Sequence, residues 1–167
     1  MKVVSIRELL AYIALHGRST WASLNTYYAV LEESDLRPEV IWIVTESTFE
    51  SQLPVLQEGF EVISIGFGLK PKVKSLVLPE GDIVEAGLEV GGLVESLKKD
   101  YRVALDITSA RKPVVAGALL ATAENKPDHI FYLMIDTLEG VSKPYPMIPR
   151  QHQQLHDLRQ ETRSPPR

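Results

Sequence analysis

Polar residues that could bind a phosphate group follow an apolar stretch in the middle of this chain. The stretch YRVAL at 101–105 is followed by DITSARK at 106–112, and the next residues, KPVVAGALLATA from Lys112, read as a helix. We therefore expect a buried strand that ends in a turn carrying hydroxyls and cations. Ligands of open α/β sheets bind at the carboxyl ends of strands, where helix N-termini offer free N–H groups. Pro113 favours a helix start here, which would leave Lys112 at the cap with its ammonium free.

A second polar turn, GRST at 17–20, also joins an apolar run to a predicted helix. Ser19 or Thr20 can cap that helix, and capping alone would explain a single Ser-Thr pair. The same hydroxyls and the backbone N–H groups beside them can also bind phosphate. Two such turns at strand ends favour one shared site at the edge of the sheet.

Two segments resemble nucleotide-binding motifs but lack residues that those motifs require. GRST lacks the upstream glycine and the lysine of a Walker A loop, and GFG at 66–68 is not followed by a third glycine and a helix start. The sequence thus supports neither ATPase nor NAD chemistry. His16 could act as a general acid or base, although a structural histidine is favoured. Asp106 ends its strand at a typical ligand position, yet an aspartate there more often binds backbone N–H groups.

Composition bounds the class of protein. A chain of 167 residues fits one domain with a sizeable core. The lack of cysteine excludes disulfides and zinc–sulfur sites, and no carboxylate–histidine cluster has metal-ligand spacing, so we expect no metal and no cofactor. No apolar run is long enough to span a membrane, which favours a cytoplasmic protein. The net charge of −4 argues against a protein that coats a DNA duplex but permits a local basic patch, either Lys70, Lys72 and Lys74 or Arg111 with Lys112.

Apolar runs alternate with helical stretches along the chain, which predicts βαβ units and a Rossmann-like α/β fold, with a mostly parallel sheet and helices on both faces. We expect the Rossmann domain over 1–149 and a partly flexible C-terminal extension over 150–167. The expected strands are 9–15, 39–47, 61–68, 101–105 and 129–136, and the expected helices are 21–34, 48–58, 82–100 and 113–125. The segment 70–81 fits either a basic loop or a short strand.

Three stretches together resemble the CARF domain (the CRISPR-associated Rossmann fold), most of all the stand-alone CARF ring nucleases of type III CRISPR systems. LLAYIALHGRST is similar to the first motif of the family, in which a strand runs into a Gly-x-Ser turn. EVIWIVTES resembles its second strand, with a polar Thr-Glu ending. DITSARKPVVAGALLATA resembles its hallmark Asp-x-Thr-x-x-x-Lys strand–turn–helix. The similarity covers about residues 9–149.

The resemblance implies a homodimer that binds a cyclic oligoadenylate, with cyclic tetra-adenylate as the expected ring, in a pocket on its two-fold axis. Family members of this kind cleave the ring without a metal to linear di-adenylate with a 2′,3′-cyclic phosphate, which switches off type III CRISPR signalling in antiviral defence. One alternative is a sensor that binds the ring without cleaving it and acts through a partner. Another is an unrelated Rossmann-like enzyme or a structural subunit.

The resemblance also assigns roles to residues. Lys112 falls on the hallmark lysine and is expected to stabilise charge on the phosphoryl oxygens, and Ser19 falls on the serine of the first motif and is expected to orient the reacting group; both are the catalytic candidates. Members often have glycine at Ser109 or Ala110, and a smaller residue at Arg18. The expected ligand-binding residues are Gly17, Arg18, Thr20, Thr108, Ser109, Ala110 and Arg111.

Overall fold

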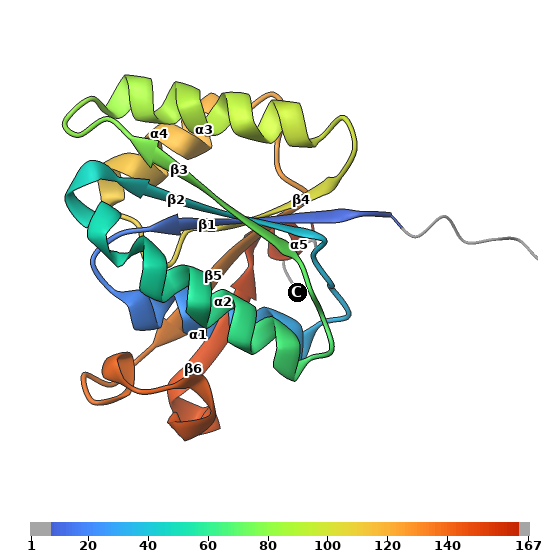
Figure 1. Ribbon diagram of the computed structural model, residues 1–167, viewed down its shortest axis with the longest axis vertical. Coiled ribbons are helices and arrows are strands. Elements are labelled where there is room, and N and C mark those ends of the chain that lie inside the picture. The colour runs from blue at the N-terminus through green and yellow to red at the C-terminus, as the bar shows by residue number, and fades with distance from the viewer. Residues whose placement is uncertain (1–7, 164–167) are drawn as a thin grey trace, which may run out of the picture.

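One six-stranded sheet organises the computed structural model, which describes residues 8–163 (Figure 1). The strands lie in the order β3-β2-β1-β4-β5-β6, and the first five in this order run parallel while β6 runs antiparallel to β5. The expected Rossmann-like α/β fold is confirmed. The strands are β1 (Leu10–His16), β2 (Val40–Glu46), β3 (Lys72–Leu78), β4 (Arg102–Asp106), β5 (His129–Ile135) and β6 (Gln153–Asp157).

Helices cover both faces of the sheet, α3 and α4 on one face and α1 and α2 on the other (Figure 1). The helices are α1 (Thr20–Glu33), α2 (Leu53–Gly66), α3 (Ile83–Leu97), α4 (Lys112–Ala121) and the short α5 (Leu158–Glu161), with 3₁₀ turns at Ser47–Gln52, Gly140–Ser142, Tyr145–Met147 and Arg150–His152. None of the helices in the described part is long and apolar enough to cross a bilayer.

The alternation of side chains along β1 explains why the core has two halves. Tyr12 and Ala14 point to the α1/α2 face, whereas Ile13 and Leu15 point to the α3/α4 face, and all four are fully buried. A strand covered on both faces must be apolar throughout, as the sequence predicted for a central parallel strand.

The predicted strand at 61–68 is wrong, because residues 61–66 belong to α2, which runs over Leu53–Gly66, and 67–68 form the turn that follows it. Its β-branched residues suggested a strand, but the buried positions are Leu56, Phe60 and Ser64, which recur at the spacing of one helix face. A strand forms instead within the segment 70–81, for which the sequence fits either a loop or a short strand; this strand is β3. Tertiary packing thus outweighed local β-propensity.

The GFG sequence ends α2. Gly68 has a φ of +75°, and the N–H groups of Gly68 and Leu69 donate to the carbonyls of Ile65 and Ser64 at 2.9 Å each. This is the Schellman arrangement that closes many helices at a glycine. The glycines that resemble part of a dinucleotide fingerprint therefore act as a helix cap.

Small residues bring α3 and α4 into direct backbone contact. A Cβ at Gly87 would lie 2.6 Å from the carbonyl oxygen of Gly117, and a Cβ at Gly117 would lie 2.7 Å from that of Ile83. Gly87, in the predicted helix 82–100, thus allows close packing against α4. This contact sets the position of α4, which begins with Lys112.

The residues after 149 include a strand that the sequence pattern did not predict. β6 pairs with β5, and its Asp157 accepts from the His129 ring at 2.7 Å and from the Ile130 N–H at 3.3 Å. Asp157 also caps α5. Residues 150–163 therefore close the open side of β5 within the same sheet.

Candidate functional site

The two polar turns singled out from the sequence meet at one edge of the sheet. β1, β2 and β4 are neighbouring parallel strands, so His16, Glu46 and Asp106 end them on the same side. The residues that follow β1 and β4 are the GRST and DITSARK turns. The predicted convergence of the two turns is confirmed.

Gly17 and Ser109 join the turns. A Cβ at position 17 would lie 2.3 Å from the Ser109 carbonyl oxygen and 3.3 Å from Ala110 Cα, so only glycine fits this close approach. The Ser109 hydroxyl donates to the Ser19 carbonyl at 2.9 Å and accepts from the Gly17 N–H at 3.2 Å. The Ser109 side chain is therefore a tie between the two turns.

Ser19 caps α1, as predicted from its position. Its Oγ accepts from the Ala22 N–H at 3.2 Å, and its backbone is extended, as an N-cap requires. The hydroxyl proton stays available to a ligand, because capping uses only a lone pair. Thr20 opens the helix and is half-buried, and Arg18, which precedes Ser19, is exposed.

Asp106 lies beneath the second turn and is fully buried. Its Oδ1 accepts from the Thr108 N–H at 2.8 Å, while its Oδ2 and the hydroxyl of buried Tyr12 have no hydrogen-bond partner among the described residues. Burial raises the pKa of Asp106 to about 7, against the lowering effect of hydrogen bonding from Thr108. Thr108 Oγ1 also accepts from the Leu133 N–H at 3.0 Å, which anchors the turn to β5.

The two cations of DITSARK differ in their surroundings. Arg111 is the N-cap residue of α4, and its guanidinium forms a two-pronged ion pair with Glu46, in which Nε donates to Oε2 at 2.7 Å and Nη2 donates to Oε1. Lys112, which we expected at the cap, is the first residue of the helix and is exposed. Among residues 8–163 no carboxylate pairs with the Lys112 ammonium. Lys112 thus offers an unneutralised charge beside the helix N-terminus.

His16 lies behind the turns and is committed to internal contacts. Its Nδ1 lies 2.8 Å from Ser23 Oγ and 3.4 Å from Ser109 Oγ, and its Nε2 lies 2.9 Å from Gln52 Oε1. Burial lowers the pKa of His16, and the Gln52 contact opposes this shift. The structural role favoured for His16 agrees with these contacts.

The basic patch at 70–74 does not belong to this edge. Lys72 begins β3, and Lys74 lies over the Trp42 ring at 5.3 Å from its centroid. Because β3 is parallel to β2, its first residues lie at the opposite end of the sheet from Glu46. Only the Arg111–Lys112 pair, of the two candidate patches, lies at the site.

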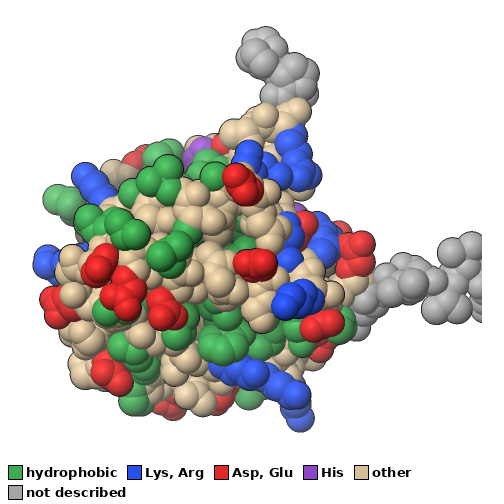
Figure 2. All heavy atoms as spheres, turned by 90° about the horizontal axis from the view of Figure 1, so that it is seen from above, with side chains coloured by type: hydrophobic (Ala, Val, Ile, Leu, Met, Phe, Trp, Pro, Cys, Tyr) green, Lys and Arg blue, Asp and Glu red, His purple; other side chains and the backbone are tan. Residues whose placement is uncertain are grey.

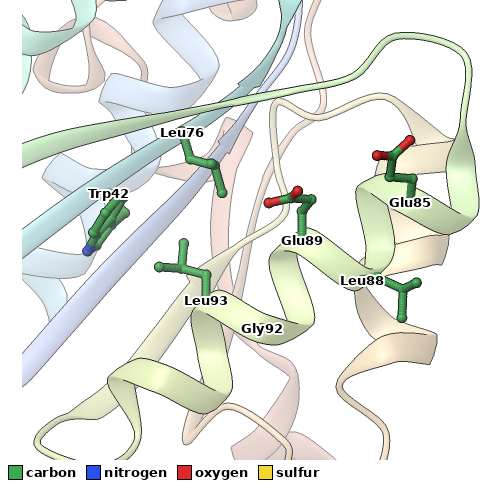
Figure 3. A pocket seen from close by; sticks show the side chains of 7 residues that line it. All are labelled: Trp42, Leu76, Glu85, Leu88, Glu89, Gly92 and Leu93. Carbon is green, nitrogen blue, oxygen red and sulfur yellow. The ribbon is translucent and has the colours of Figure 1, made fainter.

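Two cavities lie near α3, and only one of them opens at this edge. A cavity of about 210 Å³ is bounded by Glu46 and Arg111 together with the start of α3 and the start of α4. A second cavity, of about 420 Å³, lies between α3 and strands β2 and β3, and Figure 3 shows Leu93 on the side of α3 that faces Trp42 and Leu76. No predicted site residue lines the second cavity.

The outer side of α3 and α4 is a mixed surface. Figure 2 shows hydrophobic side chains on this side of the molecule among acidic ones, with Lys and Arg toward the margins. The most exposed hydrophobic residues of these helices are Val84, Leu88 and Leu120. No set of three or more His, Asp or Glu side chains in the described part of the chain is arranged to hold a metal ion.

Sequence reasoning missed Glu46 as a site residue. The signal in the sequence was its place in the polar Thr-Glu ending of an apolar run, which puts Glu46 at the end of a predicted strand. Nothing in the sequence, however, indicates which cation it pairs with, because Glu46 and Arg111 are 65 residues apart.

No sequence family and no curated protein matches this chain. Solved structures match in fold. Can2 from Sulfobacillus thermosulfidooxidans in complex with cyclic tetra-adenylate matches with a TM-score of 0.54 and 11% identity, over 74% of this chain and 31% of that chain. Enterococcus italicus Csm6 bound to cyclic hexa-2′-fluoro-hexa-dAMP matches with a TM-score of 0.52 and 13% identity, over 93% of this chain and 43% of that chain. A type III CRISPR defence DNA nuclease activated by cyclic oligoadenylate also matches, with a TM-score of 0.52 and 20% identity, over 78% of this chain and 19% of that chain.

The chain spans less than half the length of each of these three proteins. The expected resemblance is confirmed as a likeness of structure: this chain has the Rossmann-like fold that these CARF-domain proteins contain.

Proposed function

We propose that this chain binds a cyclic oligoadenylate, with cyclic tetra-adenylate as the expected ring, at the edge formed by the GRST and DITSARK turns. The observation that carries the proposal is the tie through Ser109, which joins the turns before α1 and α4. The exposed Lys112 is the first residue of α4. Two helix N-termini and an unpaired ammonium form a site for phosphates. Three proteins of the same fold bind, or are activated by, a cyclic oligoadenylate or an analogue, which supports this ligand class.

We further propose that two copies of the chain form the complete site. A ring of identical nucleotides presents the same groups repeatedly, and an isologous pair of chains offers the same side chains twice. Each copy would then place its own Ser19 and Lys112 against one phosphodiester link of the ring.

The proposed reaction is cleavage of the ring by transesterification. A ribose 2′-oxygen gives up its proton and attacks the adjacent 3′-phosphorus, the bond from phosphorus to the next 5′-oxygen breaks, and that oxygen takes up a proton. Two such cuts in a tetra-adenylate ring leave two linear di-adenylates, each with a 2′,3′-cyclic phosphate. Lys112 would stabilise the charge that builds on the phosphoryl oxygens, and Ser19 would orient the reacting link.

The residues at the edge predict slow turnover. His16, the histidine at the end of β1, is buried and has both ring nitrogens in hydrogen-bond contact with other side chains. Proton removal from the 2′-hydroxyl therefore has no uncommitted histidine to act as base among the described residues of this edge. The rate would rest on alignment and charge stabilisation alone.

The decisive experiment compares Lys112→Ala with Lys99→Ala, an exposed lysine beyond the end of α3. The purified chain is incubated with cyclic tetra-adenylate in EDTA, and the products are separated by chromatography. We expect linear di-adenylate from the unmodified chain and from Lys99→Ala, and a rate lower by about 100-fold or more in Lys112→Ala, the range seen when one charge-stabilising donor is lost. Intact ring after hours with the unmodified chain would refute cleavage.

The alternative function is a sensor that binds the ring without cutting it. The lack of an uncommitted histidine at the described edge favours this alternative, since binding needs only the phosphate contacts. The same assay, combined with a binding measurement, separates the two functions: a sensor retains the ring intact at full affinity. Failure to bind any cyclic oligoadenylate would favour an unrelated Rossmann-like enzyme or a structural subunit.

A further inference from the structure

The cavity beside the proposed phosphate site has the features of a pocket for one planar ring. Its volume of about 210 Å³ is below the range of sites for drug-sized ligands, so it has room for a base rather than a whole nucleotide. Apolar side chains of α3 and α4 supply much of its lining: Ile83, Ala86, Pro113 and Val114.

One edge of the cavity carries an ion pair with hydrogen-bonding capacity left over. The Glu46 side chain is only 6% exposed, and Arg111 takes one contact on each of its two oxygens. A carboxylate has about four acceptor positions, so each oxygen can accept one more hydrogen bond. The Arg111 guanidinium, 46% exposed, uses two of its five N–H donors on Glu46 and has others to offer.

We propose that this cavity is a subsite for a purine base that carries an exocyclic amino group. Adenine presents an amino donor next to a ring-nitrogen acceptor, which matches a carboxylate acceptor next to guanidinium donors. The Glu46 carboxylate accepts from the amino group, and Arg111 donates to the ring nitrogen. This inference rests on the proposed function and extends it from the phosphates to the base.

The position of the cavity relative to Lys112 fits a single nucleotide. Arg111 and Pro113, the two neighbours of Lys112 in the chain, both line the cavity. A base inside it leaves its ribose and phosphate at the rim, next to the Lys112 ammonium and the N-terminus of α4. Arg111 thereby acts on the base, whereas Lys112 acts on the phosphate.

The matched ligand is a ring in which every adenine is replaced by hypoxanthine. On the edge that carries N7, hypoxanthine has a carbonyl oxygen where adenine has its amino group, so this edge offers Glu46 no donor and sets an oxygen against a carboxylate. A site built around a hydrogen bond rejects an analogue that lacks the partner. We expect the unmodified chain to bind cyclic tetra-adenylate at least about tenfold more tightly than cyclic tetra-inosinate, as measured by calorimetry.

Glu46→Gln tests the assignment of the carboxylate. An amide can accept from an amino group or, when turned, donate to a carbonyl, so the preference for the adenine ring should fall to about threefold or less. Glu89→Gln, an exposed substitution on α3 away from this cavity, should keep the full preference. Equal affinity of the unmodified chain for both rings, or an unchanged preference in Glu46→Gln, overturns the inference.

A second pair of variants covers the case in which Glu46→Gln does not fold. Ile83 lines the cavity and is 49% exposed, whereas its neighbour Val84 is 71% exposed and lies outside the cavity. Ile83→Ala should lower ring affinity several-fold, and Val84→Ala should not. An equal effect of the two substitutions counts against the subsite. If the unmodified chain binds no cyclic oligoadenylate at all, the proposed function itself is refuted.

Discussion

Ser109 shows how one hydroxyl can hold two turns of the chain together. Ser109 is one of the ligand-binding residues expected from the sequence. The structure commits the hydroxyl to Ser19 and Gly17, which lie in the other turn. The role of Ser109 as a ligand-binding residue stays a prediction, while its role in aligning the two turns is visible.

Asp106 is the buried charge-bearing group beneath the site, and its titration should be coupled to folding. Its pKa is about 7 in the folded chain and about 4 in an unfolded one, because burial disfavours the carboxylate. Between pH 4 and pH 7 the folded state therefore binds more protons than the unfolded state. The stability that the protonated Asp106 carboxyl contributes is complete below about pH 4 and is lost as the pH rises to about 7.

Asp106→Asn should remove this dependence. The amide keeps an oxygen that can accept from Thr108 but cannot ionise. Relative to Asp106→Asn, the unmodified chain should lose up to about 4 kcal/mol of unfolding free energy between pH 4 and pH 7, with a constant difference above that. Urea denaturation over this pH range measures the difference, and Asp100→Asn, at an exposed position, is the control. Parallel pH curves for the two proteins would contradict the prediction.

At the scale of elements, the contact between α3 and α4 determines where the Lys112 end of α4 lies. The contact is made by backbone atoms, because Gly87 and Gly117 leave no room for a Cβ between the helices. A shift of α4 would displace Lys112 and widen or close the cavity that α3 and α4 share.

Gly87→Ala and Gly92→Ala separate packing from helix propensity. Gly87→Ala forces the helices apart and should cost about 1–3 kcal/mol of unfolding free energy, with a parallel loss of ring affinity. Gly92 lies on the same helix with no atom within 4 Å of an added Cβ, so Gly92→Ala should stabilise the chain by about 0.5–1 kcal/mol. Chemical denaturation and calorimetry measure both effects; a stabilised Gly87→Ala would show that the contact can relax.

At the scale of the whole molecule, the proposed two-fold site makes a stoichiometric prediction. If one ring lies across two copies of the chain, calorimetric titration should reach saturation at about one ring for every two chains. The mass in solution should correspond to a dimer in the presence of the ring. One ring bound per chain, with a monomer in solution, would contradict the shared site and leave each edge to act alone.

Local sequence was sufficient for most of the fold and for the two polar turns that meet at one edge of the sheet. Apolar runs predicted β1, β2, β4 and β5, since buried parallel strands must be apolar on both faces. The turns after β1 and β4 were recognisable because hydroxyls, glycine and cations there contrast with the strands before them. Ser19 as a cap followed from its type and its place before a helix.

Other features depended on packing between distant segments. The residues EVISIGFG have strand-like composition, but the burial of Phe60 and Ser64 against α1 and the sheet makes the segment helical. β6 became a strand only because β5 left an open edge beside it. Arg111 was identified as a cation near phosphates, yet its pairing with Glu46, and with it the cavity, arises where β2 and α4 meet. Periodicity reports the environment along one segment, whereas pairing across 65 residues is decided by the tertiary fold that brings the two side chains together.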